Sequence, residues 1–344
     1  MESPNPNQNP ESIIEMASAK NNPDKKGKSE KLQKSKEQAR ESFEKRFNVL
    51  VSSIQSQIKE YKAKLEDGSF EDKEGEGMGE KRKEEMERSI TKGVDRIESM
   101  KSTLDSGEDI PNITTQIEVD YVYTNPDTKK VERQETITLD LEKKLEEFTD
   151  FYKEMNIDIP LDFENEVRDI WQRNYDEIQK AVEKQGFDDI LIIPANIPLT
   201  EISQKMKMDK GYYDYIKSNS NVQDLNGIPL TSIDTDKTRI ILIHKAQNIE
   251  NSPELKSTQG KKAEELTIDE SLSLDDYTIF QRIYFKETGK HLDEKGWTWL
   301  LRTKSGSRFV LSDWDPAVGW LYVYAYDPDI SNPNLGCRAS RYFT

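Results

Sequence analysis

Two stretches in the first third of the chain repeat apolar residues at steps of three and four, which places those residues on one face of a helix. Neither helix can bury its apolar face alone, so we expect residues 31–108 to form a helical hairpin or part of a coiled coil. The two faces comprise Phe43, Phe47, Leu50, Val51, Ile54, Ile58, Tyr61 and Leu65, and then Met86, Ile90, Val94, Ile97 and Leu104.

The arm before these helices has the composition of an unfolded segment. Residues 1–30 are rich in Asn, Pro, Lys and Ser, and we expect them to be disordered. From Lys25 to Arg46 the chain carries seven Lys, two Arg and four Glu, a local charge of 9 − 4 = +5. A basic arm can bind nucleic acid or anionic lipid, but the interspersed glutamates favour a solvated start of the first helix.

The composition sets limits on the whole chain. Only 33% of the residues are hydrophobic and 34% are charged, so part of the length is expected to be solvated rather than packed. The net charge of −16 disfavours nucleic acid as the main partner. No apolar run is long enough to span a membrane and residues 1–22 lack a signal core, so we expect a cytoplasmic protein. The single cysteine, Cys337, excludes a disulfide framework, and we expect no cofactor.

The middle of the chain, residues 113–247, mixes strand and helix patterns and is expected to be a mixed α/β domain. Alternating residues on both sides of a turn at Asn125 predict a β-hairpin, which helical stripes follow. Residues 189–194 and 239–244 are short apolar runs typical of buried strands. The polar stretch 248–263 is interpreted as a linker, and the fold class is α+β.

Residues 264–344 are expected to form a separate C-terminal α+β module. A helix is predicted from Ser273, a suitable N-cap, to Gly289, a suitable C-cap. Four of the five tryptophans follow it, among turns that contain Gly, Pro, Asp and Asn, and this pattern is typical of short strands.

The segment from Trp320 to Tyr326 is the most informative part of this module. Side chains alternate along a strand, so one face carries small aliphatic residues and the other carries Trp320, Tyr322, Tyr324 and Tyr326. Each buried phenolic hydroxyl that finds no partner costs about 1–3 kcal/mol, so the aromatic face is better placed at the surface. The other possibility is a central strand that is packed on both faces, with the hydroxyls reaching a rim.

Outward-facing rings would form a binding surface, because Tyr and Trp give large contact areas with little entropy to lose. We expect a protein or another molecule as the ligand, and no catalytic residue. The candidate ligand-binding residues are Asp313, Trp314, Asp315, Trp320, Tyr322, Tyr324, Tyr326 and Asp327. In the loop that follows, Asp327, Asp329 and Asn332 are either turn residues or calcium ligands.

The order of motifs in residues 264–344 resembles that of C-type-lectin-like domains, in the branch that contains formylglycine-generating-type modules and the variable proteins of diversity-generating retroelements. The resemblance implies that the segment between Arg308 and Gly336 displays a ligand-binding surface. Together with the two apolar strands of the middle region, this tail also resembles hypothetical bacterial proteins, and that likeness implies no activity. The motifs are YTIFQRIYFKETG at 277–289, Gly296-Trp297-Thr298-Trp299, Gly306-Ser307-Arg308 and Asn334-Leu335-Gly336-Cys337-Arg338, the last similar to a closing Gly-Phe-Arg motif.

Two other functions stay open. A hydrolase would have its site between the middle and C-terminal regions, with His244 or His291 near a carboxylate and near Cys337 or a serine. The chain has no Gly-rich phosphate loop, no dinucleotide-binding Gly motif and no Gly-x-Ser-x-Gly elbow, and it lacks the cysteine pair of the sulfatase-activating enzymes in the branch that it resembles. A structural adaptor would instead use the N-terminal helices to form a homo-oligomer or to dock.

Overall fold

The fold is taken from a computed structural model, which describes residues 23–66, 78–106, 114–157, 159–160, 162–197, 213–214, 227–317 and 319–344. Its contacts divide the chain into two compact units: most of the helical hairpin belongs to the first, and residues 114–344 belong to the second. No helix within the described ranges is long and apolar enough to cross a membrane. The expected disorder of residues 1–22 concerns a segment outside the described residues.

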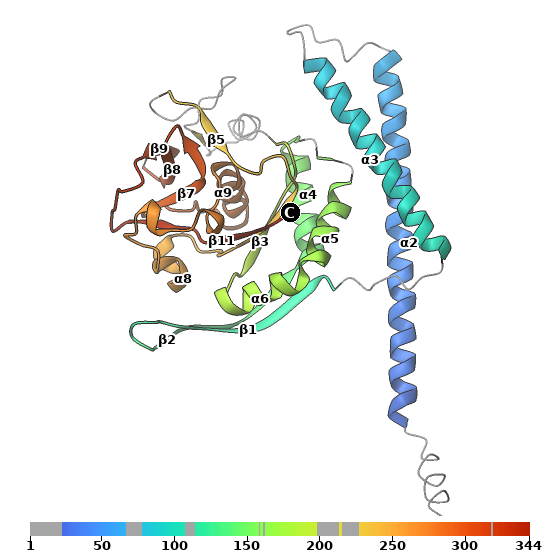
Figure 1. Cartoon of the computed structure of the whole chain (residues 1–344), viewed down its shortest axis with the longest axis horizontal. Helices are drawn as coiled ribbons and strands as arrows, with labels where there is room; N and C mark the ends of the chain where they lie inside the picture. Colours follow the sequence, from blue (N-terminus) through green and yellow to red (C-terminus); the bar gives the residue numbers. More distant parts are fainter. Residues whose placement is uncertain are drawn as a thin grey trace, which may run out of the picture. The chain divides into compact units, whose positions relative to one another are not determined.

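The expected helical hairpin is present as α2 (Pro23–Glu66) and α3 (Met78–Ser106), which run side by side in opposite directions (Figure 1). The helices approach closely at Gly93, because a Cβ atom there would lie 2.0 Å from Cδ1 of Ile54. Helix α2 begins earlier than expected. It starts at Pro23, within the segment 1–30 that was expected to be disordered.

The larger unit opens with the expected β-hairpin of β1 (Gln116–Thr124) and β2 (Val131–Asp140). Asn125 organises the turn, because its side-chain oxygen accepts hydrogen bonds from the two backbone amides at 127 and 128, at 2.9 and 3.0 Å. Three helices follow the hairpin: α4 (Leu141–Glu154), α5 (Phe163–Arg173) and α6 (Tyr175–Gln185).

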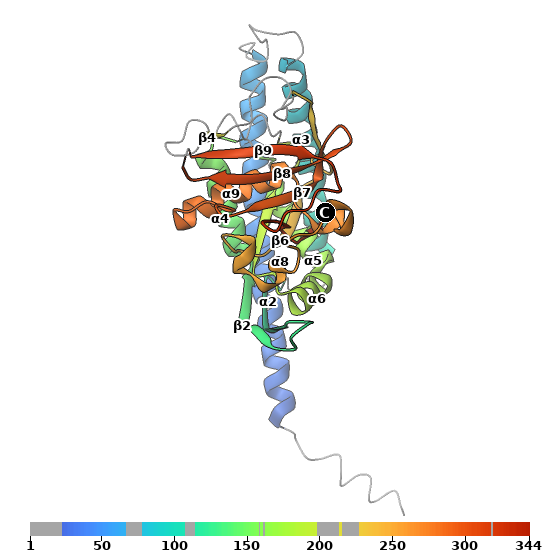
Figure 2. The ribbon, with the colours of Figure 1, turned by 90° about the vertical axis from the view of Figure 1, so that its left-hand side faces the viewer.

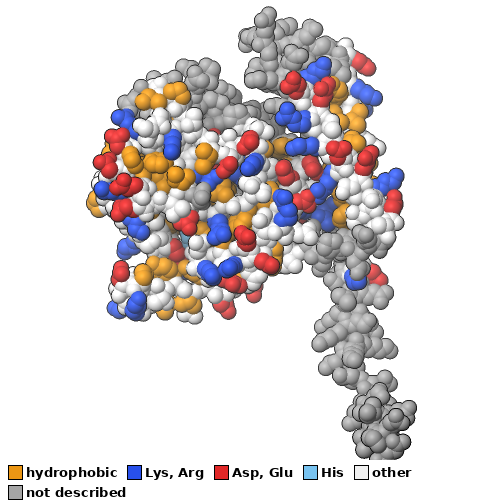
Figure 3. Space-filling model, in the orientation of Figure 1, with side chains coloured by type: hydrophobic (Ala, Val, Ile, Leu, Met, Phe, Trp, Pro, Cys, Tyr) orange, Lys and Arg blue, Asp and Glu red, His pale blue; other side chains and the backbone are white. Residues whose placement is uncertain are grey.

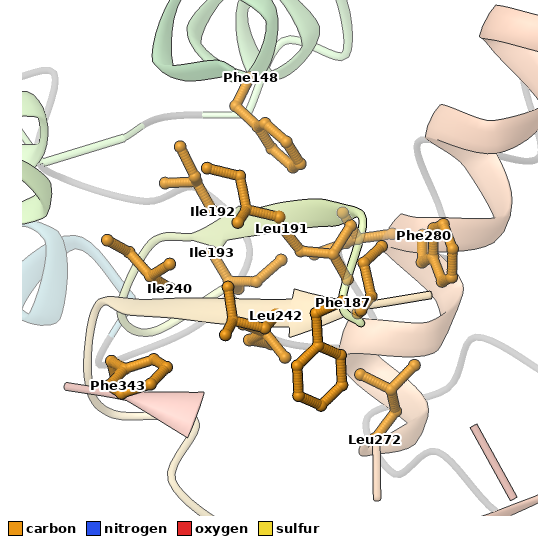
Figure 4. Packing of buried hydrophobic residues seen from close by; sticks show 14 of the residues in the cluster. Phe148, Phe187, Leu191, Ile192, Ile193, Ile240, Leu242, Leu272, Phe280 and Phe343 are labelled. Atoms are coloured by element: carbon orange, nitrogen blue, oxygen red, sulfur yellow. The ribbon is translucent and has the colours of Figure 1, made fainter. Parts of the chain in front are cut away.

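The two apolar runs form β3 (Asp189–Ile193) and β6 (Arg239–Ile243), and every residue in both strands is buried. They pair antiparallel, and β11 (Ser340–Phe343), from the end of the chain, pairs with the other edge of β6. Helix α9 (Leu274–Thr288) contributes to the same core. Figure 4 shows side chains from α4, α9 and β11 around those of β3 and β6.

A second sheet is built around an antiparallel meander of three strands, as expected for the C-terminal part of an α+β protein. These strands are β7 (Trp297–Ser305), β8 (Arg308–Asp315) and β9 (Trp320–Tyr326), and Figure 2 shows them side by side at the front of the view. The shorter strands of this sheet are β4 (Tyr213–Asp214), β5 (Leu230–Ser232) and β10 (Leu335–Cys337).

The expected boundary between a middle domain and a C-terminal module is wrong. Strand β11 completes the sheet of β3 and β6, and one hydrophobic core joins residues from β1 to β11 within a single compact unit. The stretch 248–263 is not a linker either. It contains η1 (Ile249–Asn251), α8 (Pro253–Lys256) and the start of η2 (Ala263–Glu265), which η3 (Ile268–Glu270) follows, and Ile249, Leu255 and Ala263 are buried.

The Gly336-Cys337-Arg338 motif is structural in this fold. A Cβ atom at Gly336 would lie 2.9 Å from Ile249, so only glycine lets the segment 248–263 pack this closely on β10. Arg338 is only 2% exposed, and its guanidinium donates two hydrogen bonds of 2.8 Å to the buried carboxylate of Asp293. It also donates to the backbone carbonyls of residues 246 and 247, so this arginine ties three separate segments together.

Candidate binding surface

Strand β9 turns its aromatic side chains outward, which confirms the orientation expected from its alternating sequence. Leu321, Val323 and Ala325 are at most 8% exposed. The side chains on the opposite face are partly exposed, and Tyr326 is the most exposed of them at 38%. Tyr324 also packs against the hydrophobic cluster around Trp299, so the strand is packed on both faces at that position and partly open to solvent along its ring face. We call Trp320, Tyr322, Tyr324 and Tyr326 the aromatic row.

Strand β8 supplies a second row on the same face, because paired residues on neighbouring antiparallel strands point to the same side. The pairs are Asp315 with Trp320, Asp313 with Tyr322, Leu311 with Tyr324, and Phe309 with Tyr326. The register of β7 with β8 pairs residue 299 with residue 311, which puts Trp297 beside Asp313. Carboxylates therefore lie at one end of this face and apolar side chains at the other.

The remainder of this face is covered by the chain itself. Over β7 and β10, Ala263 and Leu266 pack against Trp299 and other residues of a small hydrophobic cluster that also contains Cys337. Over β8 and β9, the described residues cover the aromatic row only in part. Figure 3, in the orientation of Figure 1, shows hydrophobic and acidic side chains interspersed over the surface of the larger unit.

The rings of the aromatic row are regularly spaced. Successive ring centroids along β9 are 5.9, 5.7 and 6.1 Å apart. Aromatic pairs at such separations stabilise one another by about 0.5–1.5 kcal/mol each, beyond the effect of burial. The row is therefore held in place before any ligand arrives, which lowers the entropy lost on binding.

Asp313 gives this surface its most unusual charged group. Burial, together with the charges of Asp293 and Asp315, raises the pKa of its carboxyl from 3.8 to about 7, and a hydrogen bond with Trp297 opposes that shift. Its Oδ1 is buried and has no hydrogen-bond partner among the described residues. Burial and then the Asp313 charge raise the pKa of the Tyr324 hydroxyl to about 12. An anion is therefore disfavoured at this site.

Asp313→Asn is expected to stabilise the protein at neutral pH more than at acidic pH. The folded-state pKa of Asp313 is raised, so the folded protein keeps a proton that the unfolded chain loses, and wild-type stability falls as the pH rises from about 4 to about 7. The amide of the variant does not titrate. The free energy of unfolding of the variant, relative to that of the wild type, should therefore rise by about 2 kcal/mol over that window, after allowance for solvent screening.

Urea unfolding at about pH 4.5 and about pH 8 measures this change in the free energy of unfolding. The matched substitution Asp120→Asn, at an exposed carboxylate on β1, is the control and should give the same stability difference at both pH values. A difference for Asp313→Asn that does not change with pH would contradict the raised pKa.

The other three candidate residues differ in their exposure to solvent. Trp314 is only 3% exposed, and its ring stacks on that of His291 at a centroid distance of 3.4 Å, so its assignment to the binding surface is wrong. It faces inward because its neighbours at 313 and 315 face outward along the same strand. Asp315 is half-buried beside Trp320, and Asp327 is exposed and forms an ion pair with Arg308 at 3.3 Å.

Two residues of this face were missing from the sequence-based set. Trp297 lies beside Asp313, and Phe309 pairs with Tyr326 and receives the ammonium of Lys304 at 4.9 Å from its ring centroid. The alternation within β8 could have revealed Phe309, which lies four residues before Asp313 and therefore on the same face of the strand. Trp297 could be placed only from the register between β7 and β8.

The residues considered for a hydrolase are deeply packed. Burial lowers the pKa of His244 to about 3 and that of His291 to about 4. Burial raises the pKa of the Cys337 thiol to about 11, which keeps it protonated and a weak nucleophile at neutral pH. Cys337 belongs to the cluster on the outer face of the sheet, whereas His291 stacks on the inward-facing Trp314, so these two do not form a reactive pair.

Other kinds of site receive no support from the described part of the chain. There, no group of three or more His, Cys, Asp or Glu side chains is arranged to hold a metal ion. The side chain of Asn332, considered as a calcium ligand, accepts the backbone amide of Asn334 at 2.9 Å and so forms a turn. Open hollows on α3 and on α5 contain none of the candidate residues. Comparison of the chain with protein-family models, with curated proteins and with solved structures finds no match.

Proposed function

We propose that this protein is a non-enzymatic binding protein, which uses the aromatic row and its acidic neighbours to hold a ligand. The observation that carries the proposal is the outward direction of the rings on β9, whose small aliphatic residues fill the core instead. Aromatic side chains gathered at a surface are typical of binding sites, because they exclude water from a large contact at a low cost in entropy.

The sequence resemblance supports the same proposal. It implies a display surface between Arg308 and Gly336, and β9 lies within that segment. We therefore take the C-terminal part, the meander and α9, to be a lectin-like module. It does not stand as an independent domain, because β11, the strand that follows the meander at the end of the chain, completes the sheet of β3 and β6.

We assign the N-terminal hairpin the role of an oligomerisation or docking arm within this proposal. Leu50, Ile54 and Met100 are buried, but Phe43 and Phe47 are only half-buried. An apolar helix face that is incompletely covered is suited to a further helix, from a second copy or from a partner. With this arm, the protein would act in the cytoplasm as an adaptor that carries a binding surface.

The triple variant Tyr322→Ala, Tyr324→Ala and Tyr326→Ala tests the proposal. Ligands are first selected on the full-length wild-type chain from a displayed library of random peptides and from an array of neutral saccharides. The variant should lose at least about tenfold in affinity for the selected ligands, because the rings supply most of the apolar contact. Its far-ultraviolet circular dichroism and its cooperative unfolding should be retained.

The control variant carries Val122→Ala and Val131→Ala, which remove exposed apolar side chains from β1 and β2. It should bind the selected ligands as the wild type does. Equal affinity of the triple variant and the wild type for every selected ligand would contradict the proposed function. Loss of folding in the triple variant would show that the rings belong to the core.

A further inference from the structure

We propose that the group recognised by this surface is a positively charged side chain, lysine or arginine, on an extended basic segment of a partner protein, and that Asp313 is its counter-charge. This inference rests on the proposed function and adds the chemistry of the ligand. The carboxylate of Asp313 lies between Tyr322 on β9 and Trp297 on β7, so an acid is flanked by aromatic rings from two strands. Acids beside aromatic faces are the groups that bind organic cations.

The spacing of the rings fits an extended peptide. Alternate side chains on one face of a strand repeat at about 6.6 Å, twice the rise per residue, and a twisted strand is shorter. The rings of the aromatic row repeat at 5.7–6.1 Å. A segment that places a cation at every second position could therefore set successive side chains against successive rings.

The charges of the surface favour such a segment over an anionic one. Asp313 and Asp315 lie in the row beside the rings, and the whole chain carries −16. The same face already contains one cation over a ring, because Lys304 lies over Phe309 within the chain. Nucleic acids would stack on the rings, but their phosphates would lie against these carboxylates.

Binding of a cation at this site should depend on pH, because Asp313 must first release its proton. Among the described residues, the groups that face Asp313 are Asp293 before β7, Trp297 on β7, Asp315 on β8, and Tyr322 and Tyr324 on β9, and none of these carries a positive charge. With a pKa of about 7, Asp313 is largely protonated at acidic pH. A cation binds to the ionised form, so its apparent affinity should be about tenfold higher at about pH 8 than at about pH 6.

The experiment uses the full-length chain and a fluorescein-labelled, N-acetylated peptide of alternating Lys and Thr, with binding followed by fluorescence anisotropy. Two matched peptides replace Lys by norleucine, which keeps the hydrocarbon stem, or by Glu. The expected order of affinity is Lys far above norleucine, with Glu weakest. Asp313→Asn should weaken binding of the Lys peptide about tenfold at about pH 8 and remove its pH dependence.

Asp120→Asn, which removes one exposed negative charge from β1, controls for non-specific attraction to an acidic protein. It should bind the Lys peptide as the wild type does. Equal losses in the two variants, equal affinity for Lys and norleucine peptides, or no binding of the Lys peptide would each overturn the inference. If the triple tyrosine variant still loses affinity for the selected neutral ligands in those cases, the proposed function stands and only the cationic ligand is wrong.

Discussion

Arg338→Met is expected to destabilise the larger unit by about 3–5 kcal/mol, the usual cost of breaking a buried ion pair from one side. The substitution removes the guanidinium but leaves Asp293, which is 1% exposed, without its partner in the interior. It also removes the donor to the carbonyl of Ala246 and leaves the carbonyl of Gln247 with only the backbone amide of Asp293. For a unit of this size, the melting temperature should fall by roughly 6–20 °C.

Urea unfolding followed by tryptophan fluorescence measures this loss. Arg341→Met is the matched control, because Arg341 lies three residues further on and its exposed side chain is 3.8 Å from Glu177. That change should cost less than about 1 kcal/mol. Adding Asp293→Asn to Arg338→Met should restore part of the stability, since no charge is then left buried. Equal effects of the two arginine substitutions would contradict the structural role of the motif.

Removal of residues 339–344 is expected to abolish the cooperative unfolding of the larger unit. Without β11, strand β6 loses its pairing along one edge and the buried ring of Phe343 no longer fills the core. The hydroxyl of Tyr342, which donates to Asp276 at 2.7 Å, is lost as well. Asp276 also pairs with Arg239, so the truncation disturbs a buried polar network.

Far- and near-ultraviolet circular dichroism on heating follow this effect. A chain shortened only by Thr344, which is exposed and outside the strand, serves as the control and should unfold like the wild type. A truncated chain without residues 339–344 that unfolds cooperatively, with a melting temperature close to that of the wild type, would show that the C-terminal strand is dispensable.

Local patterns in the sequence predicted the local structure well. Ser273 caps α9 by accepting the amide of Asp276 at 3.1 Å, and Gly289 ends that helix with a φ of 70°, as expected from their positions. The alternation of Trp320 to Tyr326 predicted the orientation of β9, because strand parity and the cost of burying hydroxyls both depend on neighbouring residues alone.

Long-range pairing explains what the sequence did not predict. The return of β11 to β6 joins residues about a hundred positions apart, and no local pattern indicates it. The polar stretch 248–263 was interpreted as a linker because of its composition, yet a few apolar side chains such as Leu255 suffice to anchor it. Trp314 was assigned to the surface beside its neighbours, although adjacent residues in a strand face opposite ways.

The central claim, that the tyrosines of β9 face water in the folded protein, can be measured directly in solution. The full-length chain would be labelled with 3-fluorotyrosine, and the ¹⁹F signals would be assigned by single Tyr→Phe substitutions and recorded with a soluble paramagnetic relaxation agent. Tyr326 should relax most strongly and Tyr322 and Tyr324 clearly, while the fully buried Tyr152 and Tyr277 should be protected. Protection of the β9 tyrosines equal to that of Tyr152 and Tyr277 would contradict the account.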